Sequence, residues 1–154
     1  LDDAARGIRR SPARDVVAER ALDALERFAP GCVAAQILVV RGATAITWRG
    51  FHRHARTQAD IAVPLDQDGL VPRVIGGAGA LRRPVDELGP IDHRLLVALG
   101  GADEDLAIVP IAIADQVICA LAVAAAPDAD LGGAAAIATA AGAAIARLMR
   151  AARR

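Results

Sequence analysis

The sequence has 154 residues and a mass of 15.8 kDa, which suits one domain and is too short for two full ones. Apolar residues make up 55% of the chain and charged residues 23%, a composition that excludes a disordered protein. The 18 basic residues, all arginine, are balanced by 18 acidic residues. Since nucleic-acid-binding proteins usually carry a basic excess, we expect a folded domain with no nucleic-acid partner.

Several features predict where such a domain works. The chain begins with Leu1 and its only methionine is Met149, so we expect a piece of a larger protein. Cys32 and Cys119 are too few for a disulfide scaffold, and free cysteines are usually buried. The N-terminal stretch is charged and lacks the apolar run of an export signal. We therefore predict a cytoplasmic location with reduced cysteines.

Two apolar stretches approach the length of a membrane span. Residues 106–126 are interrupted by Pro110 and Asp115, which fits two strands around a tight turn. Residues 131–149 consist mostly of small side chains and include Arg147, which fits a helix packed inside a domain. We expect no membrane partner.

The N-terminal part of the chain is predicted to contain one long helix. Residues 1–10 are polar and arginine-rich, so we expect a flexible lead-in to a single domain over residues 11–152. Ser11 followed by Pro12 is typical of a helix start, with the serine as the capping residue. Apolar residues then recur every three or four positions until Pro30 and Gly31 end the helix.

The remaining pattern predicts alternating strands and helices. The predicted strands are residues 33–40, 43–50, 61–65, 81–85, 106–114 and 117–125, with a polar loop over 51–60. The predicted helices are residues 68–75, 94–99 and 130–152. This order predicts an α+β domain: a central antiparallel sheet of about five to six strands with helices on its faces, including long N- and C-terminal helices.

Two stretches of the chain resemble the GAF family, which is related to the PAS sensory domains. Residues 61–88 (IAVPLDQDGLVPRVIGGAGALRRPVDEL) are similar to its run of strand, helix and a glycine–proline segment. Residues 104–124 (EDLAIVPIAIADQVICALAVA) are similar to its closing hairpin. The resemblance covers residues 14–150 and implies a sensory or regulatory module of a larger signalling protein.

The motifs of the chemically characterised GAF branches are missing from the sequence. The chain contains no Asn or Lys, which the cyclic-nucleotide branch uses, and no Asp-Ile-Pro, which the bilin branch uses beside a His. His93 alone does not replace that motif. Cys32 and Cys119 lie too far apart to suggest the clustered cysteines of the methionine-sulfoxide reductase branch.

The resemblance also implies where a ligand would bind. Arg73, Arg82, Arg83 and Arg94 lie in the segments that form the lid of a GAF pocket, and guanidinium groups suit a carboxylate or phosphate. The alternative is a solvated surface on which nearby acidic residues balance these charges. The expected ligand pocket comprises Trp48, Phe51, Leu70, Arg73, Val74, Arg82, His93 and Arg94.

The terminal helices predict a homodimer. Small residues four apart in the last helix form a flat stripe that allows two helices to approach closely. The alternative is that both helices pack on the sheet of their own chain. The expected dimer residues are Leu22, Leu25, Ala134, Ala138, Gly142 and Ile145.

The sequence contains no recognisable catalytic or metal-binding constellation. Ser11 is expected to cap a helix, not to act as a nucleophile. His52 and His54 have a spacing that can begin a metal site, but no further cluster supplies the other ligands. We therefore expect no enzyme activity, no metal and no cofactor.

Two functional hypotheses remain open. In the first, the domain binds a small ligand between sheet and lid and shifts a helix-mediated dimer between states. In the second, it is a ligand-free interaction domain that dimerises or docks other domains of the parent protein. The arginine cluster favours the first, and the shortage of polar residues around Gly76–Ala80 favours the second.

Overall fold

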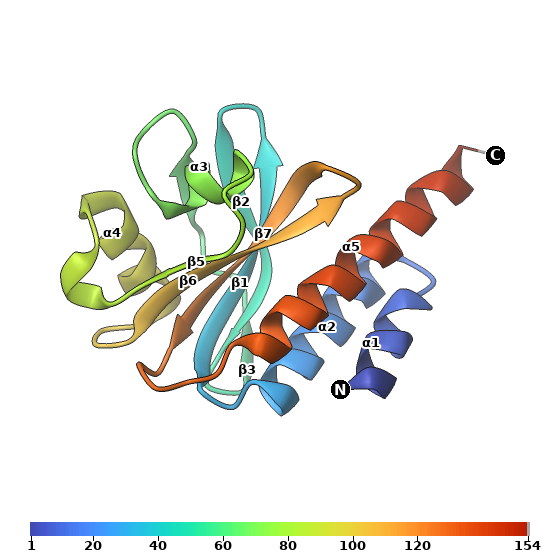
Figure 1. The fold of residues 1–154 in the computed structure, drawn as a ribbon, viewed down its shortest axis with the longest axis horizontal. Helices are drawn as coiled ribbons and strands as arrows, with labels where there is room; N and C mark the ends of the chain where they lie inside the picture. The colour runs from blue at the N-terminus through green and yellow to red at the C-terminus, as the bar shows by residue number, and fades with distance from the viewer. Residues whose placement is uncertain (154) are drawn as a thin grey trace.

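The computed structural model describes residues 1–153, which form seven strands, five α-helices and one short 3-10 helix (Figure 1). The strands are β1 (Cys32–Arg41), β2 (Thr44–His52), β3 (Ala55–Thr57), β4 (Ala62–Pro64), β5 (Leu81–Arg83), β6 (Asp105–Ile113) and β7 (Gln116–Ala125). The helices are α1 (Asp2–Arg9), α2 (Arg14–Phe28), α3 (Leu70–Ile75), η1 (Val85–Glu87), α4 (Pro90–Leu99) and α5 (Gly132–Ala152).

The strands form one antiparallel sheet in the order β3-β2-β1-β7-β6-β5, and β4 pairs with the other end of β2. Two long hairpins, β1–β2 and β6–β7, make up its centre and meet where β1 pairs with β7. The predicted α+β class is therefore confirmed. The sheet has one strand more than expected, because β3 lies in the stretch predicted to be a loop.

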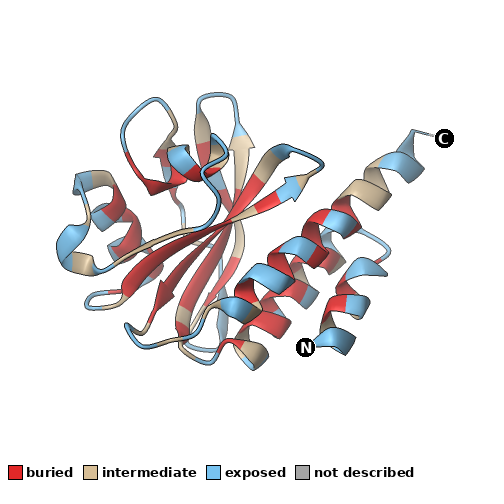
Figure 2. Cartoon of the chain, in the orientation of Figure 1, coloured by how far each residue is buried: buried red, intermediate tan, exposed pale blue. Residues whose placement is uncertain are grey.

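Helices cover both faces of the sheet (Figure 1). We call the face under α2 and α5 the helix face, and the face under α3 and α4 the lid face; α1 packs outside α2 and α5. Side chains alternate between the two faces, so each central strand contributes to two separate cores. On β7, Leu121 and Val123 face α2 and α5, whereas Ala120, Ala122 and Ala124 face α3 and α4. Figure 2 shows this buried layer across the sheet and the inner sides of the helices.

Residues 1–10 are not the flexible lead-in that their polarity predicted. Residues 2–9 form α1, in which Ala5 and Ile8 are buried against the rest of the helix-face core. Ser11 does not cap α2, which begins at Arg14 without a side-chain cap. Its hydroxyl instead donates to the Gly7 carbonyl at 3.3 Å, at the end of α1. Two apolar residues three positions apart are too weak a signal to predict a helix this short.

The stretch 51–60 is also more ordered than predicted. Arg53 and His54 adopt positive φ angles of 48° and 72° and form a tight turn between β2 and β3. Arg56 on β3 then forms ion pairs with Glu19, Asp23 and Glu26 on α2, the Glu19 contact at 3.2 Å. Charged contacts, not apolar ones, therefore attach this edge strand, which is why hydrophobic alternation did not reveal it.

Within the described residues, α5 alone is long and apolar enough to cross a membrane. In this structure its inner side lies against β6, α2 and α1. Ala134, Ile137 and Ala141 are among the side chains that it buries there. It therefore serves as a packing helix of the domain, as the sequence predicted.

Candidate functional site

The space between the sheet and the lid helices is filled by the chain's own side chains. Leu96 on α4, Leu106 on β6 and Leu38 on β1 are fully buried there. Val71 and Val74 of α3 are equally buried, and they lie over the small alanine side chains of β7. The resemblance to GAF domains implied a ligand in this position. Apolar packing occupies it here.

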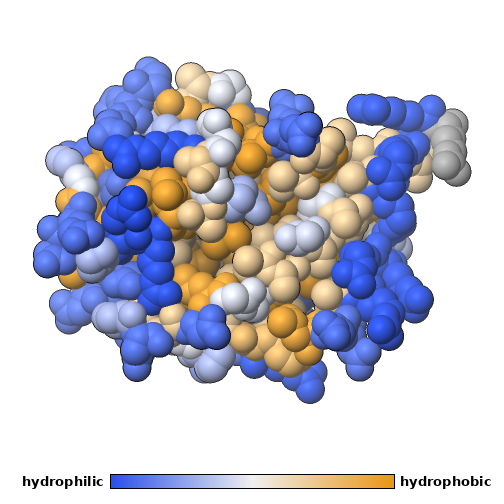
Figure 3. Space-filling view, in the orientation of Figure 1, coloured by the Kyte–Doolittle hydropathy of each residue, from blue (hydrophilic) through white to orange (hydrophobic). Residues whose placement is uncertain are grey.

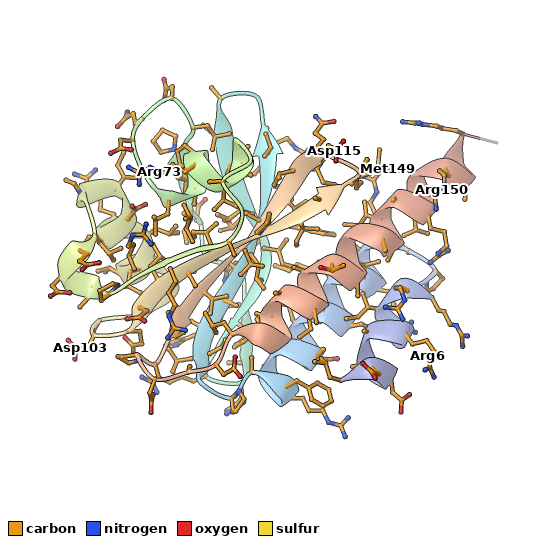
Figure 4. The ribbon with its side chains drawn as sticks, viewed as in Figure 1. Arg6, Arg73, Asp103, Asp115, Met149 and Arg150 are labelled. Atoms are coloured by element: carbon orange, nitrogen blue, oxygen red, sulfur yellow. The ribbon has the colours of Figure 1, made fainter. Side chains whose placement is uncertain are left out.

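A cleft of about 410 Å³ opens at the outer edge of the lid face. It lies where the N-terminal ends of α3 and α4 meet β5 and η1, and we call it the α3–α4 cleft. Figure 4 shows Arg73 on this side of the molecule. Its lining residues are Gln67, Asp68, Gly69, Leu70, Arg73, Arg83, Glu87, Gly89, Pro90, Ile91 and Asp92.

The charges in the α3–α4 cleft are mixed. Arg73 forms an ion pair with Asp68 at 2.8 Å, and both side chains are largely exposed. Arg83 donates to the Arg82 carbonyl at 2.7 Å and has no carboxylate partner within residues 1–153. With two guanidinium groups and three carboxylates, the cleft suits a small ligand of mixed charge better than a simple anion.

Asp92 has a structural role at the base of this cleft. Its two carboxylate oxygens accept the backbone N–H of Leu70 at 3.0 and 3.2 Å, so Asp92 caps the first turn of α3 from a distant helix. Burial raises the pKa of Asp92 above its usual range, although the Leu70 N–H and Arg73 act in the opposite direction. Sequence reasoning places Asp92 only among the acidic residues of the solvated-surface alternative, because this contact spans two elements.

The structure places the eight predicted pocket residues in several locations. Leu70 and Arg73 line the α3–α4 cleft, as expected of a lid segment. Val74 belongs to the packed lid-face core. His93 and Arg94 are exposed on α4 and do not line the cleft.

Trp48 and Phe51 do not form the floor of a lid-side pocket, and this expectation is corrected. Both contribute to the helix-face core, with Phe51 fully buried and Trp48 half-buried. They are three positions apart, so a regular strand would place them on opposite faces. A β-bulge opposite Ile37 and Leu38 leaves Trp48 as an extra residue on β2, which turns both aromatic rings to the helix face.

Arg82 is also not a pocket residue. On β5, Leu81 packs into the lid-face core, so the neighbouring Arg82 points to the other side of the sheet. There its Nε donates to Asp105 at 2.7 Å, and its Nη atoms donate to the carbonyls of Ala126 and Ala129 at 3.0 and 2.7 Å. Arg82 therefore holds the connection between β7 and α5 in place.

The six predicted dimer residues are buried by contacts within their own chain. Leu22 and Leu25 on α2 are almost completely buried, and so are Ala134, Ala138, Gly142 and Ile145 on α5. A Cβ added at Gly142 would lie 2.3 Å from the Ala112 carbonyl oxygen, so the small residues allow close contact with β6. The alternative of packing on the chain's own sheet accounts for these residues. Figure 3 shows that the opposite, outward side of α5 carries a mildly apolar band.

The histidines and cysteines form no reactive cluster. His54 lies 3.2 Å from Glu26, and the His52 ring packs beside Gly100. Across residues 1–153 no group of three His, Cys, Asp or Glu side chains could hold a metal ion. Burial raises the pKa of both Cys32 and Cys119 to about 11, which makes them weak nucleophiles at neutral pH.

A second hollow, which the sequence did not reveal, lies on the helix face near the C-terminal turns of α5. We call it the α5 groove; it has a volume of about 440 Å³. Its lining residues are Arg14, Val39, Val40, Arg41, Ile46, Thr47, Trp48, Gln116, Val117, Ile118, Cys119, Ile145 and Met149. The only sequence signal is regular alternation along the predicted strand 43–50, which places Ile46 and Trp48 on the same face.

Comparison with known proteins identifies the fold. No protein-family profile and no curated protein matches the sequence. Residues 122 to 287 of a methyl-accepting chemotaxis protein match with a TM-score of 0.72 at 19% identity, over 97% of each chain. The GAF domain of a two-component sensor histidine kinase from Bacillus halodurans matches with a TM-score of 0.69 at 12% identity, over 94% of this chain and 100% of that one.

An enzyme shares the same architecture. Free methionine-R-sulfoxide reductase from Neisseria meningitidis, solved with its substrate, matches with a TM-score of 0.71 at 14% identity, over 97% of this chain and 88% of that chain. At these identities the likeness establishes the fold and not the activity. The chain therefore has a GAF-like fold.

Proposed function

We propose that this chain is a non-catalytic regulatory module of a signalling protein. In this proposal it acts through contacts with other protein segments, not through a ligand enclosed beneath α3 and α4. Solved GAF domains of signalling proteins with the same fold support the regulatory role. The scattered histidines and the weakly acidic thiols of Cys32 and Cys119 support the absence of catalysis.

The packed lid-face core is the observation that carries the proposal. Leu96, Leu106 and Ile108 have no exposed surface. A ligand in this position would have to displace side chains of this kind, and emptying a buried leucine site costs about 2–5 kcal/mol. Contacts at the surface of the domain carry no such cost.

Native mass spectrometry of the purified chain tests the proposal. We expect the mass of the bare polypeptide under gentle conditions, because the lid-face core has no room for a guest. A bound small molecule in a one-to-one ratio, released on denaturation, would contradict the proposal. A thermal-shift screen with small amino acids and nucleotides, each expected to leave the Tm unchanged, covers ligands lost in purification.

Ligand binding in the α3–α4 cleft is the second candidate function. The Arg83 guanidinium, which has no carboxylate partner within residues 1–153, and a volume suited to a small molecule favour it. If a ligand co-purifies, Arg83→Gln should release it, whereas the exposed Arg94→Gln on α4 should retain it. Retention in both variants would exclude this cleft as the site.

A homodimer through α5 would have to use the outward side of that helix. The exposed small residues there are Ala135, Ala136, Thr139 and Ala143. The same native spectra count subunits, and Thr139→Arg should convert such a dimer into a monomer. A dimer that persists in this variant would show that α5 is not the contact.

A further inference from the structure

The α5 groove leaves apolar side chains of three neighbouring strands partly uncovered. Val39 on β1 pairs with Ile46 on β2 and with Cys119 on β7, so these three residues form one row across the helix face. Ile46 is 37% exposed, which makes it one of the few large apolar residues of the described chain on the surface. Met149 forms part of the opposite wall.

The groove is open because the two covering helices do not both reach it. Arg14, the first residue of α2, lies at its edge, so α2 covers only the sheet beyond this point. The last turns of α5 continue past the sheet (Figure 1), and Ile145 and Met149 of these turns line the groove. Figure 4 shows Met149 and Arg150 on these turns, with Asp115 at the tip of the β6–β7 hairpin.

Arginines without acidic partners in the described chain flank the groove. Arg14 and Arg41 line it directly, and neither forms an ion pair within residues 1–153. Arg147 donates to the carbonyls of Arg9 and Ser11, the first at 3.0 Å. It too has no carboxylate partner among these residues. We call Arg14, Arg41 and Arg147 the arginine rim; Arg147 lies on α5 between the groove residues Ile145 and Met149.

Few acidic groups oppose this rim. Asp15 is paired with Arg49 at 3.0 Å, and Asp115 lies on the exposed hairpin turn. The chain as a whole is neutral, so the arginine rim reflects an uneven distribution of charge. Such a distribution attracts an acidic partner and accelerates its association.

We propose that the α5 groove is a docking site for an acidic protein segment that inserts apolar side chains between the β1–β2 hairpin and α5. This inference rests on the proposed function as an interaction module and names its partner surface. The arginine rim lies on α2, α5 and the β1–β2 hairpin beside an apolar hollow, so a segment that carries both carboxylates and apolar side chains fits it better than a small anion does.

Two other occupants fit the groove less well. The apolar residues line a hollow and do not protrude, whereas insertion into a lipid surface needs protruding apolar side chains. A second copy placed symmetrically would bring two arginine rims together, and like charges repel. An acidic segment with apolar side chains satisfies both the charge and the shape.

Trp48 supplies a direct signal for the test. It is the only tryptophan in the chain, which contains no tyrosine, and it lines the groove. The probe is an amphipathic helical peptide of about four turns, with Leu on one face and Glu on the other. We expect saturable quenching or a wavelength shift of the Trp48 emission when the unlabelled peptide is added to the full chain.

Variants test whether the groove makes the contact. Arg14→Gln combined with Arg41→Gln should weaken binding about tenfold or more, since each arginine loses a charged contact. Ile46→Asp should weaken it at least as much. Arg94→Gln, an exposed arginine on α4 across the sheet, is the matched control and should bind as the parent chain does. Circular dichroism melts check that each variant is folded.

Three outcomes would overturn the inference. These are no emission change with the acidic peptide, equal binding of a peptide with Lys in place of Glu, or unchanged affinity in the Arg14/Arg41 variant. Vesicles of anionic lipid that shift Trp48 emission when the peptide does not would assign the groove to a membrane instead. A negative result in these peptide experiments would overturn the docking site but not the proposal that the lid-face core binds no ligand. A ligand found by native mass spectrometry would contradict the proposed function itself.

Discussion

Gly142 allows α5 to approach β6 more closely than any other residue would. A side chain at this position would meet backbone atoms of Ala112, which cannot move independently of the strand. We predict that Gly142→Ala lowers the free energy of unfolding by about 1–3 kcal/mol because the helix must shift away. Urea denaturation measures the change.

Gly7 is the matched control for this prediction. It lies inside α1, and a Cβ added there would meet no atom within 4 Å. Gly7→Ala should therefore stabilise the chain by about 0.5–1 kcal/mol, the ordinary helix preference for alanine. Equal effects of the two substitutions would contradict the close contact between α5 and β6.

The two cysteines provide a second prediction about individual residues. Because burial raises the pKa of Cys32 and Cys119 to about 11, the reactive thiolate is scarce at neutral pH. We expect slow labelling by a thiol reagent in the folded chain and rapid labelling of both thiols in urea. Rapid labelling of Cys119 in the folded state would show that the α5 groove opens to solvent much further than this structure indicates.

Arg82 controls a connection between elements. Its removal would free the loop between β7 and α5 and leave the Asp105 carboxylate, 8% exposed, without a partner. We predict that Arg82→Ala lowers stability by about 2–4 kcal/mol and that Arg82→Lys restores only part of it, since lysine cannot reach several acceptors at once. Hydrogen exchange across residues 126–131 should rise in parallel.

Arg83 is the control for this clamp. It is the next residue along β5, and its side chain donates only to a neighbouring carbonyl. Arg83→Ala should change stability by less than about 0.5 kcal/mol. A comparable loss in both variants would mean that the strand itself, not the clamp, determines the effect.

The ion pairs between α2 and β3 predict a pH effect. Burial acts to raise the pKa of Glu19, but hydrogen bonds from Arg49 and Arg56 outweigh it and lower the pKa overall. Because the pKa of Glu19 is lower in the folded chain than its unfolded value of 4.5, the ionised carboxylate stabilises the fold at any pH above that value. This stabilisation is lost as the pH falls through the folded pKa. Arg56→Gln should therefore destabilise the chain at neutral pH and matter less in acid.

This effect is small and must be measured as a difference. Glu19 is 43% exposed, so solvent screens the pairs and we expect about 0.5–1 kcal/mol at neutral pH, less in high salt. Asp92 acts in the opposite direction, because its raised pKa means that protonation relieves a burial cost as the pH falls. Comparing the parent chain with Arg56→Gln cancels that contribution. A difference that is constant with pH would contradict the assignment to Glu19.

For the whole molecule, α1 is the element whose role differs most from the sequence prediction. Ile8 has no exposed surface and packs with the helix-face core. We predict that Ile8→Ala lowers stability by about 2–4 kcal/mol, measured by urea denaturation, because it leaves a cavity between helices. Arg6→Ala, on the exposed side of α1, should have little effect. If Ile8→Ala left the stability unchanged, the result would support the original prediction that residues 1–10 are a flexible lead-in.

The two faces of the sheet differ in how completely the helices cover them. On the lid face, alanines of β7 let α3 settle close to the sheet, and the leucines of α4 complete the packing. On the helix face, α2 begins at the edge of the groove and does not cover it, so the α5 groove remains open. This asymmetry moves the best interaction surface from the lid to the opposite side.

The α+β class, both long hairpins and the closing helix were predictable from the sequence, because apolar periodicity along a segment reports which face of that segment is buried. The arginines and carboxylates of the α3 and α4 segments were likewise identified as a charged cluster. What no local pattern contains is the register between strands. A single bulge brings Phe51 to the same face of the sheet as Trp48, and one step along β5 directs Arg82 away from the lid.

The sequence by itself therefore determined the class of fold and the order of its elements, since these depend on spacing within short segments. Only the tertiary structure decided which side chains meet: that the lid-face core is filled, that the predicted dimer stripe packs on β6, and that Arg14 and Arg41 flank one groove. These contacts join residues far apart in the chain. They depend on strand register, helix ends and the distance between layers, which are set by packing of the whole domain.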